Sequence, residues 1–444
     1  MRVNPAIGLA VPEILLPRTG TNLEKWAVVA CDQYTSEPEY WERVAAFVGD
    51  APSALNLIFP EVYLDAPNPE GRIARIRDSM QALVTGHFFE AAEGFVYVER
   101  TTGTGNRKGL LACLDLEAYD YRKGARSLIR ATEGTILERI PPRVKIRDGA
   151  PIEIPHIMVL VDDPGDSVLG PLGRLKDAQT PLYDFELMMG AGRLAGYRVP
   201  SGPLEEGVLD ALAALANPGA FASKYDLAPG TPVLLYAMGD GNHSLATAKT
   251  IWDKTKAAAD PAAVWNSPLR FALVEIVNLH DRALVFEPIH RVLFDVAPGR
   301  NLVEEAHAFF GGHCRYSQSR SPFLMREEVD GQAGRPHRIG VVTAGGCGIL
   351  DVVAEGSQLP VGTLQVFLDA FLKSGGARGI DYVHGTEALE ALGQKPGNVG
   401  FHLPATPKNG LFKTVIVDGA LPRKTFSMGE AWEKRFYLEA RRLI

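Results

Sequence analysis

Hydrophobic residues along this chain recur at helical spacing in some stretches and form short continuous runs in others. In residues 72–85, Ile73, Ile76, Met80 and Leu83 fall on one face of an amphipathic helix. Further helices are predicted at residues 41–48, 206–215, 246–259, 364–372 and 430–442. Strands are predicted at residues 95–99, 109–116, 232–238, 270–279, 339–342 and 415–417, with a hairpin joining the first two. This interleaving of helices and strands predicts an α+β or mixed α/β fold.

The length of the chain predicts more than one domain. Its 444 residues exceed the roughly 250–300 at which a single core stops growing. Gly, Pro and Asp cluster at residues 164–176. We therefore expect an N-terminal α/β region at residues 1–165 and a C-terminal α/β region at residues 166–444.

Composition narrows the class of protein. The formal net charge of -7 argues against nucleic acid as a partner, because such proteins present basic surfaces. No apolar run reaches the roughly 18 residues needed to cross a bilayer, and the first residues lack the apolar core of a signal peptide. The four cysteines are far apart in the sequence, which favours reduced thiols. These features predict a cytoplasmic enzyme without a membrane partner, and they leave its oligomeric state open.

The most informative segment is the glycine-rich turn at residues 239–244, between a predicted strand and a predicted helix. Gly241 permits a tight turn, and the first amides of the helix, at Asn242 and Ser244, can hold phosphate. Asp240 can bind Mg²⁺ or orient a histidine, and His243 can act as a general acid or base or as a metal ligand. Alternatively, Asp240 caps the helix and His243 lies on the surface.

Two basic segments offer further phosphate ligands. In residues 130–147, Arg130 and Arg143 can form a clamp for phosphate oxygens, and Glu133 is a candidate catalytic carboxylate. The alternative is a solvated loop in which these arginines pair with local acids. Arg423 and Lys424 precede the predicted last helix and can reach an anion, or they are ordinary surface charges.

Two smaller features complete the set of candidates. Asp32, Thr35 and Ser36 follow a strand-like stretch and are candidate substrate ligands, although a turn and a helix cap explain them equally well. His290 lies in an apolar neighbourhood, which is typical of a core histidine rather than a catalyst.

Four segments together carry a family resemblance: residues 30–41, 239–244, 287–291 and 422–427. They resemble the bacterial branch of the family called domain of unknown function 1015, which is similar to the archaeal free-serine kinase. The resemblance implies a ParB/sulfiredoxin-like catalytic core and phosphoryl transfer involving serine or phosphoserine, with Mg²⁺ and a nucleotide or another phosphate carrier. The wider family reads Asp-Gly-His-His-Arg at the turn. Asn242 and Ser244 depart from that pattern, so only Asp240, Gly241 and His243 carry over.

Three functions follow as hypotheses. The first is a small-molecule phosphotransferase, a free-serine kinase or an enzyme that runs the reverse reaction. The second is a phosphoserine phosphatase that uses water as the acceptor. The third is a ParB-like nucleotide-binding regulator without catalysis. For the first two, we expect Arg130, Glu133 and Arg143 to converge on the turn, because phosphoryl transfer requires positive groups near Asp240.

Overall fold

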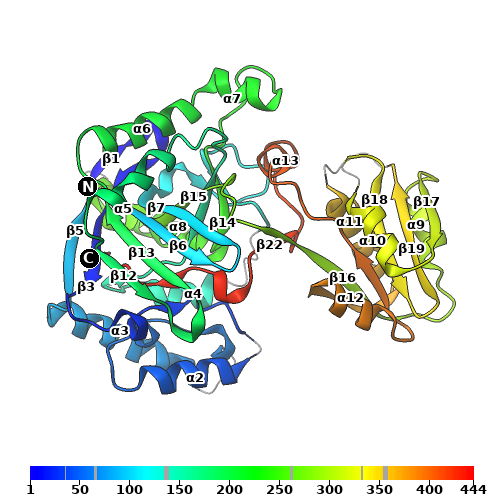
Figure 1. Cartoon of the computed structure of the whole chain (residues 1–444), viewed down its shortest axis with the longest axis horizontal. Helices are drawn as coiled ribbons and strands as arrows, with labels where there is room; N and C mark the ends of the chain where they lie inside the picture. Colours follow the sequence, from blue (N-terminus) through cyan, green and yellow to red (C-terminus); the bar gives the residue numbers. More distant parts are fainter. Residues whose placement is uncertain (36, 65–67, 135–139, 261–263, 332–333, 354–358) are drawn as a thin grey trace. The chain divides into compact units, whose positions relative to one another are not determined.

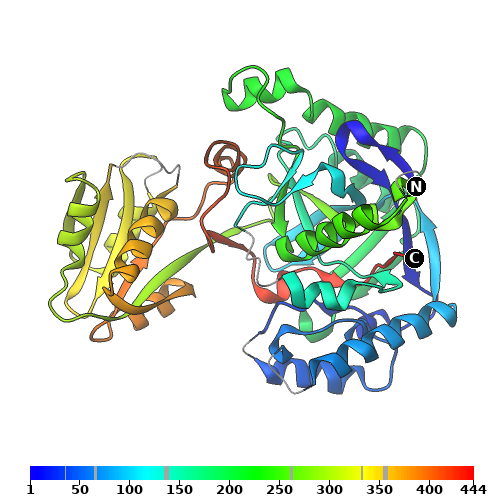
Figure 2. The same ribbon diagram turned by 180° about the vertical axis from the view of Figure 1, so that it is seen from behind.

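The computed structural model describes residues 1–35, 37–64, 68–134, 140–260, 264–331, 334–353 and 359–444. The chain forms two compact units (Figure 1, and from behind in Figure 2). Unit 1 comprises residues 1–285 and 429–444, and unit 2 comprises residues 286–428. No helix among the described residues is long and apolar enough to span a membrane.

Unit 1 is built on a mixed sheet whose central strand is β15 (Phe271–Asn278). β15 runs parallel to β11 (Met158–Val161) and antiparallel to β7 (Gly105–Asp115). The strand order is β12-β13-β6-β7-β15-β11-β14-β9-β8. In addition, β2 pairs with β7, and β1 pairs with β2. The remaining strands are β12 (Tyr183–Glu186), β13 (Arg193–Arg198), β6 (Val96–Thr102), β14 (Tyr236–Asp240), β9 (Ile129–Arg130), β8 (Tyr119–Asp120), β1 (Arg2–Asn4) and β2 (Leu9–Val11).

The sheet carries an apolar core on each face, because side chains along a strand point alternately to its two sides. On β15, Phe271 and Leu273 belong to one core, and Val274 and Ile276 belong to the other. The helices of unit 1 are α1 (Leu23–Trp26), α2 (Pro38–Val48), α3 (Pro69–Thr85), α4 (Ile140–Arg147), α5 (Leu175–Ala178), α6 (Pro203–Leu215), α7 (Pro218–Tyr225) and α8 (Asn242–Ala258). A separate pair is formed by β3 (Glu13–Pro17) and β5 (Phe89–Glu93).

The last segment of the chain returns to unit 1 as extended backbone. β23 (Phe436–Tyr437) pairs with β4 (Val28–Val29), and β24 (Arg441–Arg442) pairs with β10 (Ile152–Glu153). The helix predicted at residues 430–442 is therefore wrong. Buried ion pairs explain the outcome: Arg435 pairs with Glu275 and Glu439, and Arg441 pairs with Glu153 at 2.6 Å. The sequence pattern could not anticipate these tertiary partners.

Unit 2 has its own sheet, in the order β17-β19-β18-β21-β16-β20, with β22 paired to β16. A strand was predicted at residues 415–417, but the segment belongs to the helix α13 (Gly410–Asp418), because Leu411, Phe412 and Val415 bury one helical face. The strands are β16 (Phe286–Val296), β17 (Cys314–Ser319), β18 (His337–Thr343), β19 (Gly346–Val352), β20 (Ala377–His384), β21 (Val399–His402) and β22 (Phe426–Met428). The helices are α9 (Leu302–Phe309), α10 (Pro322–Asp330), α11 (Pro360–Lys373), α12 (Thr386–Gly393) and α13 (Gly410–Asp418).

The mixed α/β fold class is confirmed, as is the hairpin of β6 and β7. The units do not divide at residues 164–176. β11 precedes that stretch and β13 follows it, yet both strands lie in the same sheet. The Gly, Pro and Asp residues there form turns and a 3-10 helix (Gly170–Arg174) within unit 1.

Candidate active site

The glycine-rich turn joins β14 directly to α8, as the sequence predicts. Gly241 adopts φ +79°, and a Cβ atom there would lie 3.0 Å from the Cα of Ile157. Both facts require glycine. No side chain caps α8 at Gly241, so the amides of the first turn are not closed off by a capping group. Such a helix N-terminus favours an anion.

Asp240 is half-buried and uses both carboxylate oxygens. Oδ1 accepts the N–H of Gly241 at 2.9 Å, which fixes the turn. Oδ2 lies 3.4 Å from the ammonium nitrogen of Lys434, whose side chain is only 11 % exposed. The predicted acid therefore has a cationic partner from the last segment of the chain.

A second polar group gathers around His156, just before β11. Its Nδ1 lies 2.7 Å from the hydroxyl of Tyr437, and its Nε2 lies 3.4 Å from Ser244 Oγ and 3.8 Å from Asp32 Oδ2. The two ring nitrogens of His156 therefore face different partners, Tyr437 on one side and Ser244 and Asp32 on the other. The Tyr437 oxygen in turn accepts the N–H of Cys31 at 3.2 Å.

The charge balance of this group favours an ionised Asp32. Burial raises the pKa of Asp32, but the nearby His156 ring and the Gln33 amide lower it. The positive charges of Lys434 and Arg143 lower it further, so the net pKa of Asp32 lies below its ordinary value. In contrast, burial raises the pKa of the Cys31 thiol to about 12, with a further rise caused by Asp32. Cys31 is therefore a neutral thiol, not a nucleophile.

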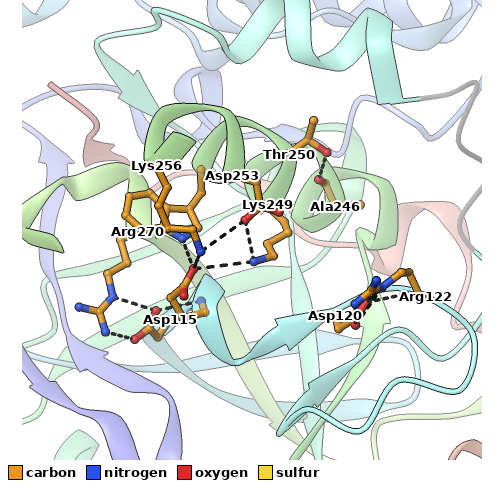
Figure 3. A network of polar contacts seen from close by, with 11 residues as sticks. Asp115, Asp120, Arg122, Ala246, Lys249, Thr250, Asp253, Lys256 and Arg270 are labelled. Atoms are coloured by element: carbon orange, nitrogen blue, oxygen red, sulfur yellow. Dashed lines mark hydrogen bonds and ion pairs between the residues drawn. The ribbon is translucent and has the colours of Figure 1, made fainter. Parts of the chain in front are cut away.

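Arg143 lines the same cavity as His156, and its positive charge acts on Asp32. It sits on α4, which packs against α8, and it pairs with Glu61. Ion pairs connect α8 to Glu117, which follows β7: its carboxylate lies 2.5 Å from the ammonium nitrogen of Lys256 and 3.9 Å from that of Lys249. Within the helix Lys249 bonds Asp253 at 2.9 Å, and Arg270 bonds Asp115 at 3.0 Å nearby (Figure 3).

Glu133, which follows β9, and His243, on α8, are both half-buried. Glu133 follows Thr132, whose hydroxyl donates to the carbonyl of Met238 at 2.8 Å, two residues before Asp240. His243 occupies the first turn of α8. Asn242 precedes it, and its Oδ1 atom is buried without a hydrogen-bond partner among the described residues.

Arg130 does not fit the predicted phosphate clamp. Its guanidinium donates to the carbonyls of Ser127 at 2.8 Å and Pro232 at 2.8 Å, before the start of β14 and away from Asp240. Burial lowers its pKa to about 10, with a smaller contribution from Arg126. We correct its role to anchoring the backbone.

Three predicted residues lie in unit 2. Arg423 bonds Asp369 at 2.8 Å and the Tyr382 hydroxyl at 2.6 Å, and Lys424 follows it in a left-handed conformation with φ 56°. The interpretation of His290 as a core histidine is confirmed: it is 1 % exposed and accepts the N–H of Leu403. Burial and the neighbouring His402 lower the pKa of His290 to about 3, so it is neutral.

The Asp32 segment contains two further predicted substrate ligands. Thr35 is exposed, and Ser36 lies outside the described residues.

An apolar cavity of about 140 Å³ adjoins the polar group. Cys31, Arg143, His156, Ser244 and Tyr437 line one part of it. Most of the remaining lining side chains are apolar, and the charged Glu61, Arg147 and Glu153 lie among them. The cavity and the polar group therefore share residues.

Sequence reasoning missed His156, Lys434 and Tyr437. His156 precedes a buried apolar strand, which was its only signal. Lys434 and Tyr437 lay inside a segment predicted to be helical, so their convergence with Asp240 and Asp32 was not visible.

The donors present suit magnesium only in part. Among the described residues, no group of three or more His, Cys, Asp or Glu side chains could hold a metal ion. Asp240 supplies one carboxylate. Such a site fits Mg²⁺ when substrate phosphates and water provide the remaining ligands.

Comparisons with solved structures give distant matches. A conserved hypothetical protein from Pyrococcus furiosus is 11 % identical, with a TM-score of 0.37, over 73 % of this chain and 93 % of that chain. A free serine kinase in complex with AMP is 10 % identical, with a TM-score of 0.37, over 75 % of this chain and 92 % of that chain. A C-terminally truncated SbnI from Staphylococcus aureus is 9 % identical, with a TM-score of 0.33, over 72 % of this chain and 82 % of that chain.

No curated protein matches the chain. The family comparison is more decisive, since a sequence profile matches residues 15–371 and so covers most of the chain, including the segments around Asp32, the turn and His290. The segment around Arg423 falls outside that match. The resemblance drawn from the sequence motifs is therefore confirmed: the chain belongs to the family DUF1015, described as a protein of unknown function.

Proposed function

We propose that this protein is a small-molecule phosphotransferase whose site is the turn at residues 240–244, with serine or phosphoserine as the substrate. One observation carries the proposal. An uncapped helix N-terminus lies beside the Asp240–Lys434 ion pair, and the first turn of that helix contacts the His156 group through Ser244. Phosphoryl transfer depends on positioning and charge neutralisation more than on covalent catalysis, and these groups provide both.

Each residue has a definite task in this proposal. The amides of Asn242, His243 and Ser244 bind the transferred phosphoryl group, and Lys434 and Arg143 offset its negative charge. Asp32 is ionised and takes the proton of the substrate hydroxyl, with His156 orienting the carboxylate. As that proton leaves, the hydroxyl oxygen forms a bond to phosphorus, and the donor oxygen departs with the electrons of the broken phosphorus–oxygen bond.

Asp240 would hold Mg²⁺ together with the phosphates of a nucleotide or another carrier, and the ion would neutralise charge on the transferring group. His243 and Glu133 stand as candidates to protonate the leaving oxygen. The same constellation would hydrolyse phosphoserine if water took the place of the acceptor hydroxyl, which keeps a phosphatase as the second candidate function.

The test uses the purified full chain with Mg²⁺ and phosphorus NMR. Serine is incubated with ATP, ADP or pyrophosphate in turn, and phosphoserine is incubated alone and with AMP or ADP. Phosphoserine formed from serine, or nucleotide phosphorylated by phosphoserine, supports a phosphotransferase. Inorganic phosphate released from phosphoserine alone supports a phosphatase. If a nucleotide binds but no phosphorus moves in any mixture, the proposal is overturned in favour of a non-catalytic regulator.

A further inference from the structure

The cavity beside the His156 group measures about 140 Å³ and is partly open to solvent. Its wall is mainly apolar, and the buried side chains on it are those of Leu57, Ile58, Phe59, Met80, Ile152 and Ile154. The charged side chains of Glu61, Arg143, Arg147 and Glu153 also line it. Ligand pockets typically combine an apolar wall with a few polar groups, and a cavity of comparable size accommodates benzene.

The position of the cavity links it to the site. His156, Ser244 and Tyr437 lie both on the cavity wall and in the polar group that contacts Asp32. Arg143 and its partner Glu61 line the same cavity. A ligand with a hydroxyl near Asp32 would therefore have an apolar space next to it, bounded by the same side chains.

Serine would leave this space empty, because its side chain ends at the reacting hydroxyl. From the adjacency of a mainly apolar cavity to a proton-accepting carboxylate, we infer that the preferred acceptor is a serine analogue that carries an alkyl or aryl group of about six heavy atoms on its hydroxyl-bearing carbon, seated in the cavity, with serine itself a poorer acceptor. This inference rests on the proposed phosphotransferase function and specifies the class of its acceptor.

The experiment compares two acceptors that share the same reacting atoms. Serine and 3-phenylserine differ by one ring on the hydroxyl-bearing carbon. Both are assayed with ATP, ADP and pyrophosphate. Burial of the ring should raise kcat/KM for 3-phenylserine about 10- to 100-fold above that for serine. Binding of benzyl alcohol, followed by NMR without any phosphate donor, reports on the cavity independently of transfer.

Three variants sharpen the comparison. Ala150→Leu fills the cavity, so kcat/KM for 3-phenylserine should fall at least tenfold while that for serine changes less than threefold. Met80→Ala removes part of the wall and covers the case in which Ala150→Leu fails to fold; it should lower the 3-phenylserine to serine ratio about fivefold. Met188→Ala is the matched control, since Met188 belongs to the same apolar core but does not line the cavity.

The outcomes separate the two proposals. Transfer to both acceptors with a ratio near one, unchanged in Ala150→Leu and Met80→Ala, overturns the inference and leaves the phosphotransferase standing. Benzyl alcohol binding that Ala150→Leu abolishes, without transfer to any acceptor, overturns the proposed function and the inferred acceptor with it.

Discussion

The two carboxylate oxygens of Asp240 have different partners: one accepts the Gly241 amide, and the other pairs with Lys434. A single substitution separates the two contacts. In Asp240→Asn the side chain still offers an oxygen to the Gly241 amide, but it no longer neutralises Lys434 or, in the proposed mechanism, holds Mg²⁺. Turnover should fall about 10²- to 10³-fold. The free energy of unfolding should fall by about 1–3 kcal/mol, because the largely buried Lys434 loses its carboxylate partner. Steady-state kinetics and urea unfolding measure the two effects.

Asp253→Asn is the matched control for that substitution. It removes a carboxylate that pairs with Lys249 on the outer face of the same helix (Figure 3). Its activity should equal that of the unsubstituted protein. Equal losses of activity in both variants would contradict a special role for Asp240.

The two arginines predicted to form one clamp should behave differently. Arg130→Ala leaves buried backbone carbonyls without a donor, so it should lower the free energy of unfolding by about 1–3 kcal/mol with KM unchanged. Arg143→Ala should raise KM for the phosphorylated partner while the free energy of unfolding falls by less than about 1 kcal/mol. A raised KM in Arg130→Ala at full stability would restore the original prediction for that residue.

Glu153 makes stability depend on pH. Burial raises its pKa, but Arg147 and Arg441 lower it by more, so its pKa in the folded protein lies below the ordinary value. A depressed pKa stabilises the fold above the unfolded-state value, about 4.3, and that contribution disappears as the pH falls through the folded-state value. Glu153→Gln should therefore unfold at lower urea concentration than the unsubstituted protein at pH 7. The gap should narrow as the pH falls below about 4, and it should be absent at all pH values in the exposed control Glu24→Gln.

At the scale of elements, the sequence pattern predicted those helices, strands and turns whose conformation depends on neighbouring residues. The strand, turn and helix from β14 to α8 were predicted because glycine chemistry and helical periodicity act within a few residues. Residues 430–442 contain apolar and charged positions that suit a helix equally well, but buried pairing of Arg435 with Glu275 and strand pairing with β4 decide their conformation. Those partners are more than a hundred residues away, so the pattern within the segment could not reveal them.

The turn itself can be tested by glycine substitution. Gly241→Ala places a Cβ at φ +79°, only 3.0 Å from the Ile157 backbone, and should lower the free energy of unfolding by about 2 kcal/mol or more. Gly207→Ala, within α6, meets no atom within 4 Å and should raise that free energy by about 0.5–1 kcal/mol. Urea unfolding of both variants checks the contrast, and a neutral Gly241→Ala would show that the turn adapts.

At the scale of the whole molecule, the two units suggest that unit 2 is an insertion into unit 1. The amide of Gly429 donates to the carbonyl of Val285 at 3.3 Å, so the two ends of unit 1 at the junction already meet. A chain in which a short Gly-Ser linker replaces residues 286–428 should fold, with a single cooperative thermal transition for unit 1. Circular dichroism and calorimetry test this, and loss of cooperative unfolding would mean that unit 1 requires unit 2.

The site illustrates the same limit of sequence reasoning. Asp240, Gly241 and Ser244 could be predicted to lie together because they fall within five residues of one turn. Asp32, His156 and Lys434 come from segments distant in sequence, so the sequence alone does not show that they lie close to the turn in the folded chain.

The return of residues 429–444 into unit 1 has a consequence for limited proteolysis. Lys434 and Tyr437 supply the cation beside Asp240 and the hydroxyl beside His156, and both follow unit 2 in the sequence. A protease that cuts within unit 2 would therefore break the covalent link between these two residues and the rest of the candidate site. Only strand pairing and buried ion pairs, such as those of Arg435 with Glu275 and Arg441 with Glu153, would then hold the segment in place.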